Sequence, residues 1–513
     1  MIELQVFQPI RASSLSREDW KSVLECRLFL DEKRDGRIKG RLVGGTAGSH
    51  QDRSAYPNLS SPTVRWESVM ITLKIAASEG RSIAVGDIPG AYLHARMEDL
   101  TEGRTPQRLL RIRGLLADLL RELDTSYADY SNARGEIIVR LNKALYGLIE
   151  SAKLWYEEIK TTLAKIGLAP SVYDPCVFHN RKRTVTLCVY VDDLLFTYLD
   201  RKDYDHIIAC LESGYGPMRK QTGNTVDYLN VQITKVTIAG KHALGTLLIH
   251  QNAYIKKLLE KYQVQGMSEI PHTSTLFDID SSSPPAVSKD RFVALVMALL
   301  YVCNRARPDI FLDISFLCTR LSKPTQEDEA KLLRVLRYLN RFADLGMALA
   351  PVDINQLHVV AYVDASYACH ADAKGHTGTV VCIGDSPSGI VLAKAKKQRL
   401  VARSSTESEL IGLHDSTPAV VWTQNFLQEA GFPQLPAVVY QDNKSTIHMG
   451  ETGHGTYARS KHIAVRYFGV HELIELSKVV LKYKNTADMW ADLFTKPLMG
   501  SQFTKLRDIL MGA

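Results

Sequence analysis

Two apolar runs rich in β-branched residues flank a pair of adjacent acidic residues within residues 184–197. The runs have the composition of β-strands, so this stretch predicts a hairpin with Asp192 and Asp193 at or beside its turn. Two neighbouring carboxylates held against apolar side chains repel each other and resist loss of water, so they take up protons or cations. Mg²⁺ and Mn²⁺ prefer oxygen ligands of this kind. An ordinary Asp-rich β-turn is the alternative that the hairpin alone leaves open.

Two strand-like stretches lie upstream of the hairpin. Residues 37–43 follow a turn, and an alternating strand would place Lys39 and Arg41 on one face. That face could bind a triphosphate, or it could be an ordinary solvent-exposed face. Residues 82–87 predict a strand that ends at Asp87, immediately before a Pro-Gly turn.

Helical spacing of apolar residues predicts the other elements of the first two thirds of the chain. A helix is expected over residues 64–79, with its cap at 61–63. Leucines at the same spacing predict a second helix over 107–123, inside an insert-like stretch at 100–139. Beyond residue 226 the pattern predicts a strand at 228–234, helices at 254–262, 291–301 and 324–342, and a linker rich in Ser, Pro and Asp at 268–288.

The helix at 324–342 carries Lys331, Arg334, Arg337 and Arg341 at every third or fourth position. These residues share one helix face, which would suit a nucleic-acid backbone. A solvated face is the alternative, because acidic residues alternate with them nearby.

Four separated acids form a second pattern in the last third of the chain. A strand at 359–363 ends at Asp364, and a capping box at 404–407 begins a helix that carries Glu409. A strand at 436–440 ends near Asp442, and a last helix around 486–494 carries Asp492. Any one of these acids alone would be a cap or a surface charge. The order strand Asp, helix Glu, strand Asp, helix Asp resembles the order in which an RNase H fold collects four acids at one end of a mixed sheet.

Composition narrows the class of protein. The chain has 513 residues, of which 45% are hydrophobic and 23% charged. That is enough for roughly three to four globular domains. A net charge of +7 indicates a mild preference for polyanionic partners. The eight cysteines lack metal-ligand spacing, which favours a reduced, intracellular setting. We expect no signal peptide and no membrane-spanning segment.

Three motifs, in this order, resemble the reverse transcriptases of copia-type retrotransposons: Asp87 with residues 91–93, then residues 143–148, then residues 190–193. The resemblance covers nearly the whole chain. Other similar stretches are residues 39–43, 61–68, 251–259, 307–310, 335–339, 362–365, 404–409, 442–445, 460–463 and 491–496. Departures from the family pattern are the insert-like stretch at 100–139, Ile149-Glu150 in place of a basic residue and Gln, which puts template contact there in doubt, and Gly44-Gly45 in place of bulkier side chains.

The resemblance implies an α+β fold. A right-hand polymerase with fingers, palm and thumb would be followed by a connection and an RNase H-like α/β domain with a mixed sheet. The expected divisions are fingers and palm at 1–265, linker with thumb and connection helices at 266–355, and the RNase H-like domain at 356–513.

For the polymerase site, the resemblance implies two Mg²⁺ or Mn²⁺ ions bound by Asp87 and Asp192, with Asp193 as a supporting third carboxylate. Tyr92 would be the steric gate that excludes a ribose 2′-hydroxyl, and its alternative role is half-buried packing under the palm. Lys39 and Arg41 would contact the incoming triphosphate.

Gly147 would let backbone approach nucleotide or template closely, and the alternative is a simple turn before a helix.

For the nuclease site, the resemblance implies that Asp364, Glu409, Asp442 and Asp492 bind two further ions. Glu409 is preferred to Glu407, because Glu407 is occupied in the capping box. Asp492 is preferred to Asp488 by its place in the motif. His462 also matches a family motif, and a structural role for it is at least as good an interpretation.

The expected protein is therefore an RNA-directed DNA polymerase with a ribonuclease H, encoded by a retrotransposon. Its partners would be an RNA template, a DNA primer or RNA–DNA hybrid, and deoxynucleoside triphosphates, with no membrane. The oligomeric state is left open. The expected location is intracellular, in a cytoplasmic virus-like particle or in the nucleus. The alternative is a decayed or co-opted copy that binds nucleic acid without catalysis.

Overall fold

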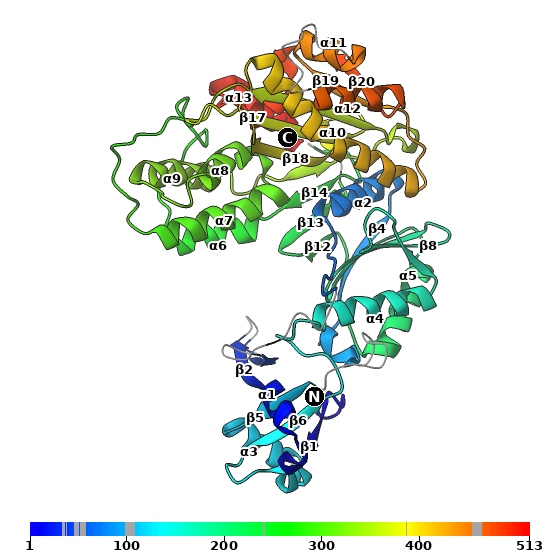
Figure 1. The fold of residues 1–513 in the computed structure, drawn as a ribbon. Helices are drawn as coiled ribbons and strands as arrows, with labels where there is room; N and C mark the ends of the chain where they lie inside the picture. The colour runs from blue at the N-terminus through cyan, green and yellow to red at the C-terminus, as the bar shows by residue number, and fades with distance from the viewer. Residues whose placement is uncertain are drawn as a thin grey trace.

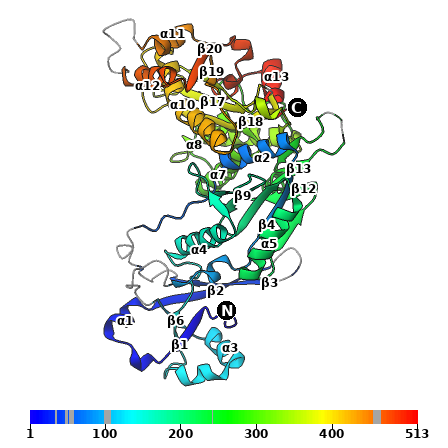
Figure 2. The same ribbon diagram turned by 90° about the vertical axis from the view of Figure 1, so that its right-hand side faces the viewer.

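A computed structural model describes residues 1–32, 36, 38–45, 51, 58–97, 108–238, 240, 242–385, 387–453 and 464–512. The fold is α+β, and it extends from an N-terminal sheet at one end, through a central sheet, to a C-terminal α/β domain at the other (Figures 1 and 2). None of the described helices combines the length and the apolar character needed to traverse a lipid bilayer.

The N-terminal sheet has five strands in the order β1-β6-β5-β2-β3. The strands are β1 (Phe7–Ile10), β2 (Leu24–Glu32), β3 (Ile38–Gly44), β5 (Leu109–Ile112) and β6 (Ile137–Leu141), with short helix α1 (Arg17–Ser22). The predicted helix at 107–123 is wrong in its first half, since β5 pairs with both β2 and β6 and the helix α3 begins only at Leu115 (Leu115–Leu123). Residue 107 lies outside the described residues.

The central sheet has the order β11-β4-β10-β9-β8-β7. Its strands are β4 (Ser82–Asp87), β7 (Leu168–Pro170), β8 (Val177–Asn180), β9 (Val185–Tyr190), β10 (Asp193–Tyr198) and β11 (Arg219–Thr222). Leu195 packs in one hydrophobic cluster and its neighbours Leu194 and Phe196 pack in another. Both faces of β10 are therefore buried, which explains why its sequence is a continuous apolar run.

Three helices accompany this sheet: α2 (Trp66–Glu79), α4 (Ser151–Lys165) and α5 (Arg201–Tyr215). Helix α2 was predicted, but its cap is not at 61–63. Its N-cap residue is Arg65, and the Asp174 carboxylate accepts hydrogen bonds from the Arg65 backbone N–H (3.0 Å) and from Ser68 Oγ (2.6 Å). A residue 109 positions away along the chain thus satisfies this helix end.

A four-stranded sheet in the order β12-β13-β14-β15 follows. It contains β12 (Thr225–Tyr228), β13 (Val231–Lys235), β14 (Leu247–His250) and β15 (Met347–Leu349). The predicted single strand at 228–234 is wrong, because Leu229 and Asn230 have φ angles of 51° and 56° and turn the chain back as a tight hairpin.

Helix α6 (Asn252–Lys261) lies at the end of the expected fingers and palm division. The expected thumb and connection region contains α7 (Lys289–Arg305), α8 (Phe311–Cys318) and α9 (Gln326–Arg341). Residues 268–288 form no helix or strand, as predicted, yet they are packed against the protein. Buried His272 lies 3.2 Å from Asp313 on α8, and its Nε2 lies 2.9 Å from the carbonyl oxygen of Leu498. His272 is therefore anchored in the interior, whereas most of the segment is exposed.

The basic face of α9 binds this segment. Arg334 Nε donates to the carbonyl oxygen of His272 (2.8 Å), Arg337 Nε donates to that of Gln265 (3.1 Å), and Arg341 pairs with Glu269 (2.6 Å). Lys331 pairs with Glu327 and donates to the carbonyl oxygen of Asp278. These contacts show that the face docks residues 265–278, while Arg337 and Arg341 remain exposed. The nucleic-acid face and the solvated face both stay predictions.

The C-terminal domain is a mixed sheet in the order β18-β17-β16-β19-β20. Its strands are β16 (Val359–Ser366), β17 (His376–Ile383), β18 (Ile390–Lys397), β19 (Ala437–Gln441) and β20 (Val479–Tyr483), and its helices are α10 (Ser405–Glu429), α11 (Lys444–Thr452), α12 (Ala464–Glu475) and α13 (Gly500–Met511). β16 pairs antiparallel with β17 and parallel with β19. The predicted helix at 486–494 consists of two short 3₁₀ helices, Thr486–Asp488 and Trp490–Phe494.

Packing runs across the predicted division at 265/266. β14 pairs with β15, and one hydrophobic cluster joins α2, helices α6 to α9 and the C-terminal sheet. Buried Lys74 on α2 donates to the carbonyl oxygens of Ala350 (2.6 Å) and Ser388 (3.3 Å), and burial lowers its pKa to about 8. The three domain divisions remain predictions.

A pair of buried histidines lies between the C-terminal sheet and the segment that contains Phe277. His370 Nε2 lies 3.0 Å from His376 Nδ1, and Phe277 packs against both rings. Burial, followed by the charges of His370 and Lys397, lowers the pKa of His376 to about 3. The folded state therefore keeps His376 neutral at pH values where the unfolded chain protonates it.

We predict that acidification from pH 7 to 5 costs the wild type about 2 kcal/mol more unfolding free energy than it costs His376→Gln. Stability from a lowered histidine pKa is present above the unfolded-state pKa and is lost as pH falls toward the folded-state value. Urea unfolding at both pH values measures the difference. Exposed His206 provides the control, and His206→Gln should behave as the wild type. Equal losses in wild type and His376→Gln would contradict the prediction.

Candidate active sites

The acidic hairpin forms as predicted. β9 and β10 pair antiparallel with Tyr190 opposite Asp193, which leaves Val191 and Asp192 as the two turn residues. Val191 has a φ of 57°, in the left-handed region that β-branched residues rarely adopt. The turn that carries Asp192 is therefore under local backbone strain.

Asp87 lies beside this turn. It is the last residue of β4, and it stands directly opposite Asp193 in the antiparallel pair β4–β10. The next residue, Ile88, donates its backbone N–H to the carbonyl oxygen of Asp192 (3.1 Å). The fold thus brings Asp87, Asp192 and Asp193 to one end of the central sheet, although the three do not form a set with oxygen atoms all within 4.8 Å of one another in the described structure.

The electrostatics of these acids reflect their proximity. Burial, then the charges of Asp192 and Asp87, raises the pKa of Asp193 to about 6. Burial also raises the pKa of Asp192, with Asp87 adding to the effect, while Lys39 and Arg41 oppose it. An excess of negative charge in a half-buried position fits the binding of divalent cations.

The basic residues of the site come from two strands. Lys39 and Arg41 lie on β3, close enough to act on Asp192, and Arg41 also pairs with Asp31. Arg219 on β11 was not singled out from the sequence, and its Nη1 lies 3.8 Å from Asp87 Oδ2. Only the pairing of β11 with β4 brings it there, so no local motif could have indicated it.

Tyr92 lies in a 3₁₀ helix (Ala91–His94) just after the β4 strand. Its ring meets that of Tyr146 edge to face, with centroids 5.0 Å apart. Burial, then the charge of Asp192, raises the pKa of Tyr92. The ring is half-buried and close to the carboxylates, an arrangement that both interpretations of Tyr92 share.

Gly147 makes a close contact within the protein. Its φ is 87°, and a Cβ there would lie 2.3 Å from the carbonyl oxygen of Gly44 and 2.6 Å from Val43 Cγ1. Gly44 in turn donates its N–H to the carbonyl oxygen of Tyr146 (2.8 Å). The glycine thus lets this turn pack against β3, which carries Lys39 and Arg41.

We expect Gly147→Ala to destabilise the protein by about 2–4 kcal/mol, because it combines a strained backbone with a steric clash. Gly135→Ala is the matched control, since Gly135 also has a positive φ (72°) but a Cβ there would meet nothing within 4 Å. Urea unfolding should show a cost for Gly135→Ala that is smaller by about 1–3 kcal/mol, the part due to overpacking. Equal costs for the two variants would show that the contact with Gly44 is unimportant.

Glu150, one of the residues that depart from the family pattern, has a structural role. Glu150 is buried and pairs with buried Arg108, with Nε to Oε1 at 2.6 Å and Nη2 to Oε2 at 3.3 Å. The carboxylate therefore faces the interior, where Arg108 compensates its charge.

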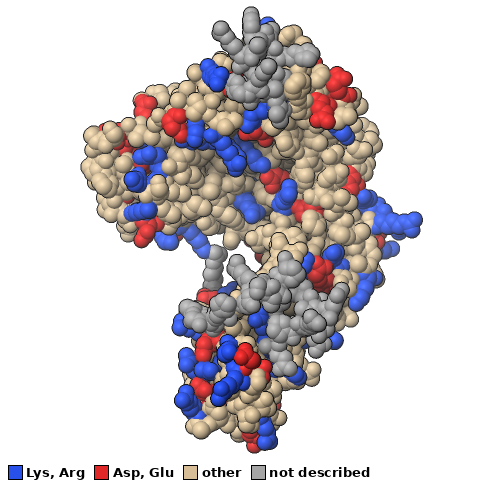
Figure 3. Space-filling view, viewed as in Figure 1, with Lys and Arg blue, Asp and Glu red and all other residues tan. Residues whose placement is uncertain are grey.

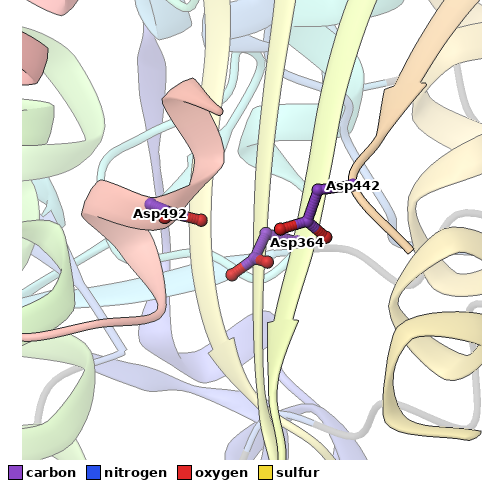
Figure 4. Close-up of side chains that lie close together, drawn as sticks. All are labelled: Asp364, Asp442 and Asp492. Carbon is purple, nitrogen blue, oxygen red and sulfur yellow. The ribbon is translucent and has the colours of Figure 1, made fainter. Parts of the chain in front are cut away.

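The second candidate site lies at one end of the C-terminal sheet. Asp364 on β16, Asp442 just after β19, and Asp492 in the 3₁₀ helix 490–494 offer oxygen atoms that all lie within 4.8 Å of one another (Figure 4). Asp364 and Asp492 are buried. Four separate segments of sequence were predicted to converge here, and three of their acids form this cluster.

The chemistry of the cluster fits a divalent cation. Asp492 Oδ2 is buried and finds no hydrogen-bond partner among the described residues, and one oxygen from each of the three aspartates lies within 4.8 Å of the others. Lys496 Nζ provides partial compensation, at 2.7 Å from Asp492 Oδ1 and 3.4 Å from Asp364 Oδ1. Burial, then Asp364, raises the pKa of Asp492 to about 7 even so. Oxygen ligands with uncompensated negative charge are what Mg²⁺ and Mn²⁺ bind.

Glu409 on α10 lies next to the cluster rather than within that set of three. Its carboxylate accepts a hydrogen bond from Gln441 Nε2 (3.3 Å), and burial, then Asp364 and Asp442, raises its pKa to about 10. It is close enough to the cluster for its charge to be suppressed by those of the aspartates.

Glu407 and Asp488, the alternatives to Glu409 and Asp492, make other contacts. The Glu407 N–H donates to Ser404 Oγ (3.2 Å), but its carboxylate accepts from the Arg403 N–H (2.9 Å), so the predicted capping box is only half formed. Asp488 is exposed and pairs with Lys505 (2.8 Å). His462 lies outside the described residues.

Comparisons with known proteins agree with this architecture. Residues 127–273 match the family described as reverse transcriptase (RNA-dependent DNA polymerase). Over 94% of its length the chain also superposes on a foamy viral protease-reverse transcriptase solved in complex with double-stranded DNA, with 68% of that chain covered, a TM-score of 0.50 and 12% identity. The expected α+β fold is confirmed, and the likeness to a solved reverse transcriptase is one of fold.

The particular relatives are retrotransposon polyproteins. The chain is 25% identical over 508 residues to the retrovirus-related Pol polyprotein from transposon TNT 1-94 of Nicotiana tabacum. This match covers 96% of this chain and 36% of the relative. It is 27% identical over 492 residues to that from transposon RE2 of Arabidopsis thaliana (93% and 31% covered) and 23% identical over 496 residues to the Ty1-H Gag-Pol polyprotein of Saccharomyces cerevisiae (94% and 26%). The resemblance to copia-type Pol polyproteins is confirmed over most of the chain, which spans about a third of the length of these relatives.

Proposed function

We propose that this chain copies RNA into DNA by nucleotidyl transfer and that its C-terminal domain hydrolyses the RNA of RNA–DNA hybrids. The observation that carries the proposal is the pairing of Asp87 with Asp193 beside the Asp192 turn, in a chain whose residues 127–273 match the reverse transcriptase family.

In the polymerase site, Asp87 and Asp192 would hold two Mg²⁺ or Mn²⁺ ions, and Asp193 would support them. Such ions stabilise the attacking and leaving oxygens of an in-line phosphoryl displacement. Lys39 and Arg41 would bind the triphosphate of the incoming deoxynucleotide, and both already act on Asp192. Tyr92 would exclude a 2′-hydroxyl. Gly147 would keep the strand that bears the two basic residues close to the palm.

In the nuclease site, Asp364, Asp442 and Asp492 would hold two ions together with Glu409. The ions would activate water against the RNA strand. Lys496 and Thr495 orient Asp364, since both contact its carboxylate. RNA would be distinguished from DNA by its 2′-hydroxyl groups.

The partners would be an RNA template, a DNA primer or RNA–DNA hybrid, and deoxynucleoside triphosphates. The net charge of +7 supports polyanionic partners. Figure 3 shows a hollow between the upper and lower parts of the molecule, with Lys and Arg side chains on the surface above and below it. The proposed location is intracellular, in a cytoplasmic virus-like particle or in the nucleus.

Primer extension on poly(rA)/oligo(dT) tests the polymerase, and cleavage of a labelled RNA–DNA hybrid tests the nuclease. Both should proceed with Mg²⁺ or Mn²⁺ and stop with EDTA. A template that is retarded on a gel but neither extended nor cleaved would refute the proposal and identify a nucleic-acid-binding copy without catalysis.

A further inference from the structure

The strained turn that carries Asp192 is held by an indole. Trp155 Nε1, on helix α4, donates a hydrogen bond to the carbonyl oxygen of Val191 at 2.7 Å, and Trp155 is 2% exposed. The following carbonyl oxygen, that of Asp192, accepts the Ile88 N–H at 3.1 Å. Both peptide carbonyls of the turn are therefore bound by groups from other segments.

The two hydrogen bonds to the turn carbonyls matter because the backbone at Val191 is strained. With φ at 57°, Val191 is in a conformation that a β-branched residue leaves when nothing holds it. Relaxation would rotate the peptide between Val191 and Asp192, and it would move the Asp192 side chain relative to Asp87. A buried hydrogen bond to the Val191 carbonyl opposes that rotation, because its loss would leave the carbonyl unsatisfied.

Trp155 also contacts the segment that follows Asp87. Its ring packs on His94 (centroids 6.4 Å apart) and edge to face on Tyr215 of α5 (5.3 Å). His94 lies 3.2 Å, through Nε2, from the carbonyl oxygen of Pro89, two residues after Asp87. One side chain thus connects α4, the Asp192 turn and the loop after β4.

We propose that Trp155 is a positioning residue for the polymerase site, acting through its indole N–H to fix the Asp192 carboxylate relative to Asp87. This inference rests on the proposed function only for its kinetic readout. The hydrogen bond should matter for cation binding by the two carboxylates even if no primer is extended.

The test replaces the donor and keeps the ring. Trp155→Phe removes the N–H, and benzothienylalanine at position 155 replaces it with sulfur in nearly the same shape. Trp422→Phe is the matched control, because Trp422 Nε1 also donates to a backbone carbonyl, that of Tyr173 (3.3 Å), which is not part of the Asp192 turn. All proteins carry Asp442→Asn, so that Mn²⁺ binding reports the polymerase site.

For both position-155 variants we expect a kcat for primer extension about 10-fold lower or more, and a half-saturating Mn²⁺ concentration several-fold higher, with primer–template binding within about 2-fold of the parent. Mn²⁺ titration by electron paramagnetic resonance, without nucleic acid, should show the same weakening. Trp422→Phe should match the parent in every readout. A purely structural role would lower the melting temperature and leave the Mn²⁺ dependence unchanged.

Unchanged kcat and Mn²⁺ affinity in the benzothienylalanine protein would overturn the inference, even if Trp155→Phe does not fold. If the parent extends no primer but the position-155 variants still bind Mn²⁺ more weakly, the proposed polymerase function fails and the positioning role stands.

Discussion

Asp87→Asn should lower primer extension by at least about 10³-fold while hybrid cleavage stays within about 2-fold of wild type. Asn has nearly the same shape as Asp, so the β4–β10 pairing that places residue 87 opposite Asp193 should persist. What is lost is one negative charge and a cation-binding oxygen at the end of the central sheet. Because half-buried Asp192 and Asp193 alone then face the cations, the site should bind them too weakly for transfer.

Steady-state extension on poly(rA)/oligo(dT) measures this effect. Asp205→Asn is the control, since Asp205 is an exposed acid on α5 that pairs with Arg201. It should extend primers at the wild-type rate. Extension by Asp87→Asn within 10-fold of wild type would show that Asp87 does not bind a catalytic cation.

Asp364→Asn should abolish hybrid cleavage to a similar extent, by at least about 10³-fold, and leave extension intact. Asp364 is the central member of the C-terminal cluster, buried on β16 and contacted by Thr495 and Lys496. Replacing it removes one of the three carboxylates whose oxygens meet within 4.8 Å in the described part of the chain. Exposed Asp488 is the control, and Asp488→Asn should cleave normally.

The melting temperature in Mn²⁺ tests whether the C-terminal aspartate cluster binds a cation. Mn²⁺ should raise the melting temperature of the wild type, because a ligand that binds the folded state stabilises it. In an Asp87→Asn background, where the polymerase site is weakened, Asp364→Asn should lose most of that increase. An undiminished increase would place the bound cation elsewhere.

The sequence predicted those features that local chemistry determines. The acidic hairpin, the strand that ends at Asp87 and the order of elements that carry the C-terminal acids are all present in the fold. Each depends on a short run of β-prone residues next to an acid, so neighbouring residues suffice to indicate it. Which of these acids bind cations remains a prediction.

Features that depend on distant partners were mispredicted, as for the cap of α2, or not foreseen, as for the contacts of α9. The cap of α2 comes from Asp174, and the basic face of α9 binds residues 265–278. Apolar spacing cannot separate a strand such as β5 from the start of a helix when both are buried. The residues around Asp87 and Asp192 were missed for the same reason, since Arg219 and Trp155 reach this site only through the packing of β11 and α4.

The most direct test of two separate sites uses one substrate, an RNA template labelled on the RNA and annealed to a DNA primer carrying a second label. Extension and cleavage are followed in the same tube for wild type, Asp87→Asn, Asp364→Asn and the double variant. We expect wild type to do both, each single variant to lose one activity, and the double variant to lose both. Loss of both activities from either single substitution, or no extension by the wild type, would contradict the account.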